Sequence, residues 1–131
     1  MSKRTITLTD RAPVTITEES WPVIARATDS QHDGEYDFQA NCSSRWIVRV
    51  RQHEDGRAIV YATYEYSTRY RGERGFIARR GELLDPGDDI ISAIRRVCDD
   101  IAQAECSGDD SARWPTLAAE CIADLPAVQL D

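Results

Sequence analysis

Alternating apolar and polar positions predict strands at the start of the chain. The segments TITLT (5–9) and VTIT (14–17) alternate β-branched with polar residues. They flank a turn at Asp-Arg-Ala-Pro (10–13), which is typical of a short β-hairpin over residues 1–17.

In residues 20–28 the alternation gives way to a spacing of three to four residues, which is typical of a helix. Ser20 is a good N-cap, and Pro22 is favoured in the first turn of a helix. The apolar positions at helical spacing are Trp21, Ile24, Ala25 and Thr28. We therefore expect a short helix over 20–28, followed by a strand over 36–40 (YDFQA), where the alternation returns.

The segment IVRVRQHEDGRAIVYATYEY (47–66) predicts two long strands joined by a turn. A two-residue Asp-Gly turn would divide the apolar side chains between both faces. A three-residue turn, with Gly56 left-handed, gathers them on one face. Burying each large side chain is worth ~1.5–3 kcal/mol, which exceeds the difference between two good turns, so we expect the three-residue turn. The predicted buried face is Trp46, Val48, Val50, Val60, Ala62 and Tyr64.

The end of the chain predicts one more strand and two helices. The strand FIARRGELL (76–84) ends at Asp-Pro-Gly and completes an antiparallel sheet over 36–80. A strongly amphipathic helix follows, capped by Asp88 or Asp89, and a loop leads to a last helix that begins at Trp-Pro; together they span 88–125. Arg95–Asp99 and Arg96–Asp100 are expected as i,i+4 pairs.

These elements predict a single α+β domain over 1–131, a small antiparallel meander packed against two or three helices. A content of 41 % hydrophobic and 30 % charged residues fits one soluble globular domain with a modest core. No apolar run approaches a membrane span, and no apolar stretch follows the N-terminal basic residues, so we expect a cytoplasmic protein. The four cysteines are then expected as reduced thiols.

Charge is segregated along the chain. Residues 45–80 hold nine arginines and four acids, whereas residues 81–131 hold three arginines and twelve acids; the whole chain has a formal net charge of -7. Such a division predicts either mutual neutralisation within the fold or two surfaces of opposite sign that bind partners.

No motif for catalysis, cofactor or metal stands out. His53 adjoins Glu54 and Asp55, but consecutive residues on a turn tip do not converge on a substrate. The glycines form no phosphate loop, and the cysteines have no metal-binding spacing. We therefore expect a non-enzymatic protein without cofactor or metal.

The arginine-rich middle of the chain is one candidate contact surface, for a protein partner or for nucleic acid. Its expected members are Arg49, Arg51, Tyr61, Arg69, Arg71, Arg74, Arg79 and Arg80. Arg49 opposite Tyr61 is an expected cation–π pair. The element order is similar to that of double-stranded-RNA-binding domains, but Asp-Pro-Gly-Asp-Asp (85–89) stands where such domains place phosphate-binding lysines.

The acidic end of the chain is the other candidate, because a row of carboxylates can imitate a nucleic-acid backbone toward a basic protein. Its expected members are Asp99, Asp100, Glu105, Asp109 and Asp110. A solvated helix face is the ordinary alternative.

Three stretches carry a resemblance: TITLTDRAPVTITEESWPVIA, VRQHEDGRAIVYATY and RRGELL. They resemble small uncharacterised accessory proteins of Gram-negative phages and plasmids. The resemblance implies an anti-CRISPR-like inhibitor in the bacterial host, which binds a host protein or ribonucleoprotein complex through a charged face. The alternative is a small nucleic-acid-binding or regulatory protein that uses the arginine-rich sheet face and loop.

Overall fold

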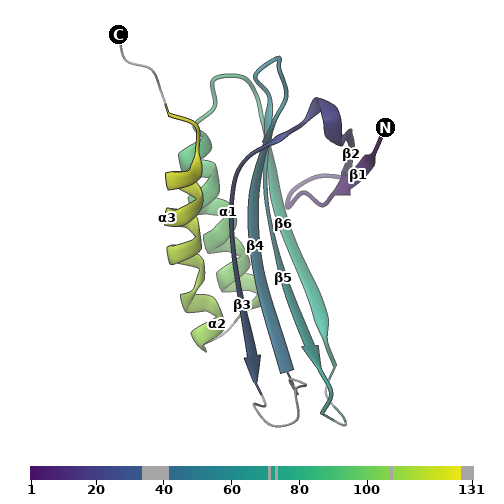
Figure 1. The fold of residues 1–131 in the computed structure, drawn as a ribbon, viewed down its shortest axis with the longest axis vertical. Helices are drawn as coiled ribbons and strands as arrows, with labels where there is room; N and C mark the ends of the chain where they lie inside the picture. The colour runs from purple at the N-terminus through teal and green to yellow at the C-terminus, as the bar shows by residue number, and fades with distance from the viewer. Residues whose placement is uncertain (34–41, 71, 73, 107, 128–131) are drawn as a thin grey trace.

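A four-stranded antiparallel sheet forms the centre of the molecule, and its strands neighbour one another in chain order (Figure 1). The structure is a computed structural model, which describes residues 1–33, 42–70, 72, 74–106 and 108–127. The strands of the sheet are β3 (Val23–Asp33), β4 (Cys42–Gln52), β5 (Ala58–Thr68) and β6 (Phe76–Leu84).

Helices cover one face of this sheet, and a small hairpin covers part of the other (Figure 1). The helices are α1 (Ile90–Glu105), α2 (Gly108–Ala112) and α3 (Trp114–Asp124). The hairpin is formed by β1 (Lys3–Ile6) and β2 (Val14–Thr17), and a 3-10 turn, η1 (Glu18–Ser20), follows it. The predicted α+β class, an antiparallel meander packed against helices, is confirmed.

The register of β4 against β5 follows the predicted three-residue turn. Val50 lies opposite Val60, and Trp46 lies opposite Tyr64. His53 N–H donates to the Arg57 carbonyl at 2.9 Å, which closes the turn, and Gly56 has a φ of +98°. A positive φ is costly for any residue with a Cβ, so glycine suits this position.

The main core lies between the sheet and the helices. Trp46, Val48, Val50 and Val60 are each fully buried there. From the other side α1 contributes its buried stripe, which is Ala93, Ile94, Val97, Cys98, Ile101 and Ala102. Asp89 caps α1 as expected, because its side chain accepts the Ser92 N–H at 3.2 Å.

A second, smaller core lies under the β1–β2 hairpin, on the opposite face of the sheet. Its buried members are Ile6, Leu8, Ile16, Trp21, Ile59 and Tyr61. The hairpin therefore covers only the end of this face of the sheet that holds the β4–β5 turn (Figure 1).

The helix expected over 20–28 is wrong, because this segment forms the edge strand β3. The register shifts between Val23 and Ala25 where β3 pairs with β4. This bulge interrupts the alternation, so that neighbouring apolar residues imitate a helical stripe. Beyond it, Ala25 and Ala27 are buried while Arg26 and Thr28 are exposed, which is the period of a strand.

Three further expectations concern the helices and the loops. The expected loop over 106–111 contains the short helix α2 instead. The expected Arg96–Asp100 pair does not form, since Arg96 binds Glu82 and Asp100 binds Arg80, and no ion pair joins Arg95 to Asp99 among the described residues. The strand expected over 36–40 lies outside the described residues.

Among the helices of the described part, none combines the length and the apolar character needed to cross a membrane.

The packing of the turn gives a test by substitution. A Cβ built on Gly56 meets the Pro86 Cβ at 3.1 Å, so Gly56→Ala adds a close contact to the strain of a positive φ. We expect it to lower the free energy of unfolding in urea by about 1–2 kcal/mol. Gly87→Ala is the matched control, because Gly87 has a φ of +89° and nothing near its built Cβ. A loss for Gly56→Ala no larger than that of the control contradicts the packing of the turn on Pro86.

Candidate functional site

Arg51 and Tyr61 lie under the β1–β2 hairpin and not on an outward basic face. Their exposed fractions are 6 % and 7 %. Arg51 Nε donates to the Tyr61 hydroxyl at 2.8 Å, and Nη1 donates to the Trp21 carbonyl at 3.0 Å. Glu18 Oε1 lies 3.6 Å from Nη2. The expected outward placement of these two residues is wrong, because the hairpin covers this end of the sheet.

Arg80 also turns away from the expected basic face. It lies opposite Ala62, on the helix side of the sheet. There its Nε is 3.2 Å from Asp100 Oδ2, and its Nη2 binds Glu105. One arginine thus neutralises two members of the expected acidic face and ties β6 to α1.

The remaining acidic residues of the expected acidic face also bind side chains within the fold. The Tyr64 hydroxyl donates to Asp110, and burial together with this carboxylate raises the pKa of Tyr64. The Gln103 amide donates to both oxygens of Asp99. The side chain of Asp109 lies outside the described part of the chain. The expected acidic face is therefore mostly engaged within the fold and is not a row of free carboxylates.

The uncovered part of the sheet brings other arginines together. We call it the open sheet face; it lies on the side opposite the helices, beyond the β1–β2 hairpin (Figure 1). Its residues are Arg26, Thr28 and Ser30 on β3, Arg45, Ile47 and Arg49 on β4, Thr63 and Glu65 on β5, and Ile77 and Arg79 on β6.

The guanidinium groups of the arginines on the open sheet face form no ion pair within the described part of the chain. Arg26, Arg45 and Arg79 are exposed, and Arg49 is half-buried. Arg45 lies opposite Glu65, yet no ion pair within 4.0 Å joins them in the residues that the structure describes. Four guanidinium groups thus face solvent on one surface against a single carboxylate.

Two of these arginines lie directly across from each other. Arg26 on β3 is opposite Arg49 on β4, in the regular part of the register. Like charges at directly opposed positions of a sheet destabilise the pairing. An anionic ligand bound between the two guanidinium groups would reduce their mutual repulsion, because each group would then form an attractive, charge-assisted contact with the same anion.

Hydroxyl groups and a shallow depression complete the face. Thr28, Ser30 and Thr63 lie between the arginines and supply short hydrogen-bonding side chains. A depression of about 610 Å³ lies at the Ser30 end of the face, bordered by Arg45, Glu65 and Ile77 and, outside the face, by Tyr66 and Phe76. None of the ten residues of the open sheet face is aromatic. Such a surface matches phosphate oxygens better than stacked bases.

The expected cation–π pair of Arg49 with Tyr61 does not form within the described residues, where Tyr61 binds Arg51 instead. The loop after β5 presents Arg69 and Arg74 to solvent, and Arg71 lies outside the described residues. Arg26 is a member that sequence reasoning missed, because its segment had been assigned to a helix. The alternation in Ala-Arg-Ala-Thr (25–28) was the available signal.

The cysteines and His53 take structural positions. Burial raises the pKa of Cys98 and of Cys121 to about 12, so that both stay protonated thiols at neutral pH. His53 Nδ1 accepts the Asp55 N–H at 3.1 Å, and its ring packs against Trp21. No group of three potential metal ligands occurs among the side chains that the structure describes.

Comparison with known proteins adds no relative. No protein-family model, no curated protein and no solved structure matches the chain.

The buried arginine under the hairpin can be tested directly. Arg51→Met keeps an unbranched side chain but leaves the Tyr61 hydroxyl and the Trp21 carbonyl without their donor. We expect the free energy of unfolding to fall by about 2–4 kcal/mol in chemical denaturation. Arg57→Met is the control, because Arg57 is exposed and also touches the Trp21 ring. Equal losses for the two variants contradict an anchoring role of Arg51.

Proposed function

We propose that this chain is a non-enzymatic binding protein that holds nucleic acid by its phosphates on the open sheet face. The observation that carries the proposal is the set of four arginines without an acidic partner in the described residues, two of them directly opposed. Lys and Arg contacts to phosphates supply most of the affinity of sequence-independent nucleic-acid binding.

The surroundings of these arginines favour nucleic acid over a protein as the ligand. Protein interfaces have a core of aromatic and other apolar side chains within a polar rim. The centre of the open sheet face has instead Ile47, which is 7 % exposed, among arginines and hydroxyls. Interfaces with nucleic acid are polar and strongly positive throughout.

The type of contact follows from the side chains available. Arginines and hydroxyls on a sheet reach phosphate oxygens, whereas single-strand binders add aromatic platforms for the bases. Tyr61 is buried under the hairpin, and the exposed aromatic side chains Tyr70 and Phe76 lie outside the ten residues of the open sheet face. We therefore expect binding to duplex nucleic acid with little dependence on base sequence.

The acidic helices set the direction of approach. Residues 81–131, which include all three helices, hold twelve acids and three arginines. The helices cover the face opposite the open sheet face (Figure 1). The molecule is thus electrically polar, and its field steers a polyanion to the arginine side in spite of the net charge of -7.

Fluorescence anisotropy with a short DNA duplex tests this proposal. Four phosphate contacts predict a slope of about -3.6 for the logarithm of the association constant against that of the salt concentration. The double variant Arg45→Gln/Arg49→Gln should reduce the slope to about -1.8, because each lost contact removes about 0.9. Neither side chain forms an ion pair within the described part of the chain, so the fold should persist.

Arg95→Gln/Arg96→Gln is the matched control. It removes the same charge from exposed positions of α1, on the other layer of the molecule. We expect its salt slope to equal that of the unchanged protein. Equal effects of the two double variants, or no binding of duplex at low salt, overturn the proposal.

We also propose a second candidate, a protein-binding inhibitor of a nucleic-acid-handling complex, of the anti-CRISPR-like kind. A specific observation favours it. Tyr70, Phe76 and Ile77 are 46 %, 45 % and 52 % exposed, and the latter two begin the edge strand β6. Exposed apolar side chains beside a charged surface are typical of protein-binding sites.

This candidate predicts a different set of sensitive residues. The chain should co-elute with a purified RNA-guided nuclease complex and slow its DNA cleavage. Tyr70→Ser should weaken that association at least tenfold, because apolar anchors dominate protein interfaces. The same variant should leave duplex affinity unchanged. If no such complex binds the chain, or if the variant binds as well as the unchanged protein, this candidate fails.

A further inference from the structure

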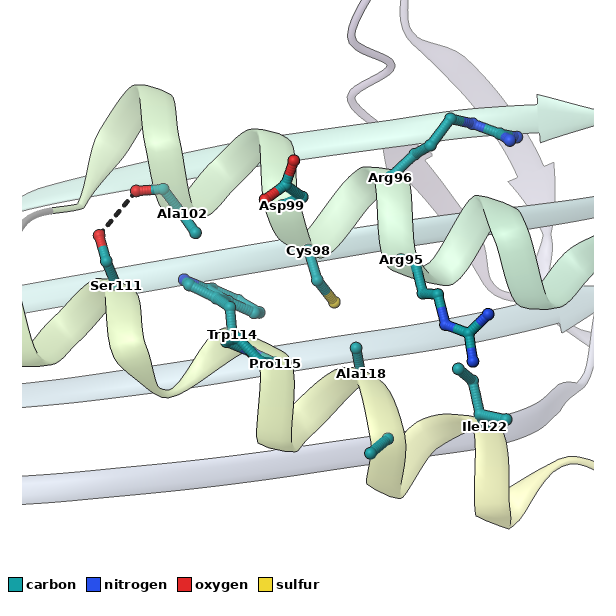
Figure 2. Close-up of a pocket in the computed structure, with 11 residues that line it drawn as sticks. Arg95, Arg96, Cys98, Asp99, Ala102, Ser111, Trp114, Pro115, Ala118 and Ile122 are labelled. Atoms are coloured by element: carbon teal, nitrogen blue, oxygen red, sulfur yellow. Dashed lines mark hydrogen bonds between the residues drawn. The ribbon is translucent and has the colours of Figure 1, made fainter.

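A groove runs between α1 and α3 on the outer side of the helical layer (Figure 2). Its volume is about 580 Å³, which lies in the range of sites for small organic ligands. The residues that line it are mainly apolar and small. Those on which the argument depends are Arg95, Cys98, Ala102, Trp114, Ala118 and Ile122.

Small side chains keep the groove open. Ala102 on α1 and Ala118 and Ala119 on α3 occupy positions where larger residues would fill the space between the helices. The Trp114 ring lies between the two helices and is fully buried, held by its Nε1–H, which donates to Cys106 Sγ at 3.4 Å (Figure 2). The groove therefore has a fixed apolar floor.

One end of the groove carries a positive charge without an ion-pair partner in the described residues. Arg95 is exposed and extends from α1 toward α3, near Ile122 (Figure 2). The other charged residues of the rim point away from α3 and have partners of their own. Arg96 Nη2 binds Glu82 Oε1 at 2.9 Å, and Asp99 accepts from the Gln103 amide (Figure 2).

We propose that this groove binds a small amphipathic carboxylate, with its apolar chain along Pro115, Ala119 and Ile122 and its carboxylate on Arg95. An apolar trough with one cation at its end is complementary to a molecule of that polarity. A guanidinium binds a carboxylate through two parallel hydrogen bonds, which fixes the direction in which the ligand lies. The site rests on no residue of the open sheet face.

Dodecanoate is the probe for the test, with dodecyltrimethylammonium as a probe of equal chain and opposite charge. Isothermal titration calorimetry below the micelle concentration of each should show tighter binding of the anion. Arg95→Gln should weaken dodecanoate about tenfold and abolish the preference for the anion. Ala119→Phe, at an exposed rim position, should block both probes without disturbing the core.

A second measurement locates the ligand within the molecule. A dodecanoate that carries bromine on its last carbon quenches tryptophan fluorescence at short range, so it should quench the indole of Trp114 beneath the groove, and Trp114→Phe should lose most of that quenching. Binding with equal affinity for both probes, binding unaffected by Ala119→Phe, or no binding overturns the proposal. A concentration-dependent dimer that is broken by Ala119→Phe overturns it as well, since a second copy then fills the groove.

Discussion

The register between β4 and β5 is the constraint on which the rest of the structure depends. A three-residue turn with Gly56 at a positive φ puts Trp46, Val48 and Val50 on the same side as Val60. That side becomes the floor for the helices. A slip by one residue would send these side chains to the other face and bring the arginines into the core. The conformation of one turn thus determines which face of the sheet packs against the helices and which face carries the arginines.

The N-terminal hairpin then divides the arginine side of the sheet into two parts. At one end it buries Ile59 and Tyr61 and encloses Arg51, whose hydrogen bonds to Tyr61 and Trp21 satisfy a charge that would be costly to bury alone. Beyond the hairpin the same face is uncovered, and its arginines meet solvent. The small second core therefore limits the extent of the proposed binding surface. Arg51 and Arg49 lie on the same strand, yet the first is enclosed by the hairpin and the second is not.

The hairpin register and the terminal helices could be predicted from the sequence because each depends on a local pattern. Turn chemistry selects the register, and Asp89 with the apolar stripe specifies α1. The strand β3 could not be predicted in this way, because a bulge near Val23 hides its alternation and pairing with β4 decides its state. The expected binding residues were partly wrong for the same reason. Burial of Arg51 and the ion pair of Arg80 with Asp100 depend on contacts between segments that are distant in the sequence.

We propose that a ligand contacts the arginines of the open sheet face, which form no ion pair among the described residues, and not the acidic helices. Nuclear magnetic resonance of the nitrogen-15-labelled protein, titrated with a short DNA duplex at low salt, tests it most directly. We expect the backbone amide signals of Arg26, Arg45, Arg49 and Arg79 to shift together, while those of α1 and α3 stay in place. Shifts confined to the helices, or none at all, would contradict it.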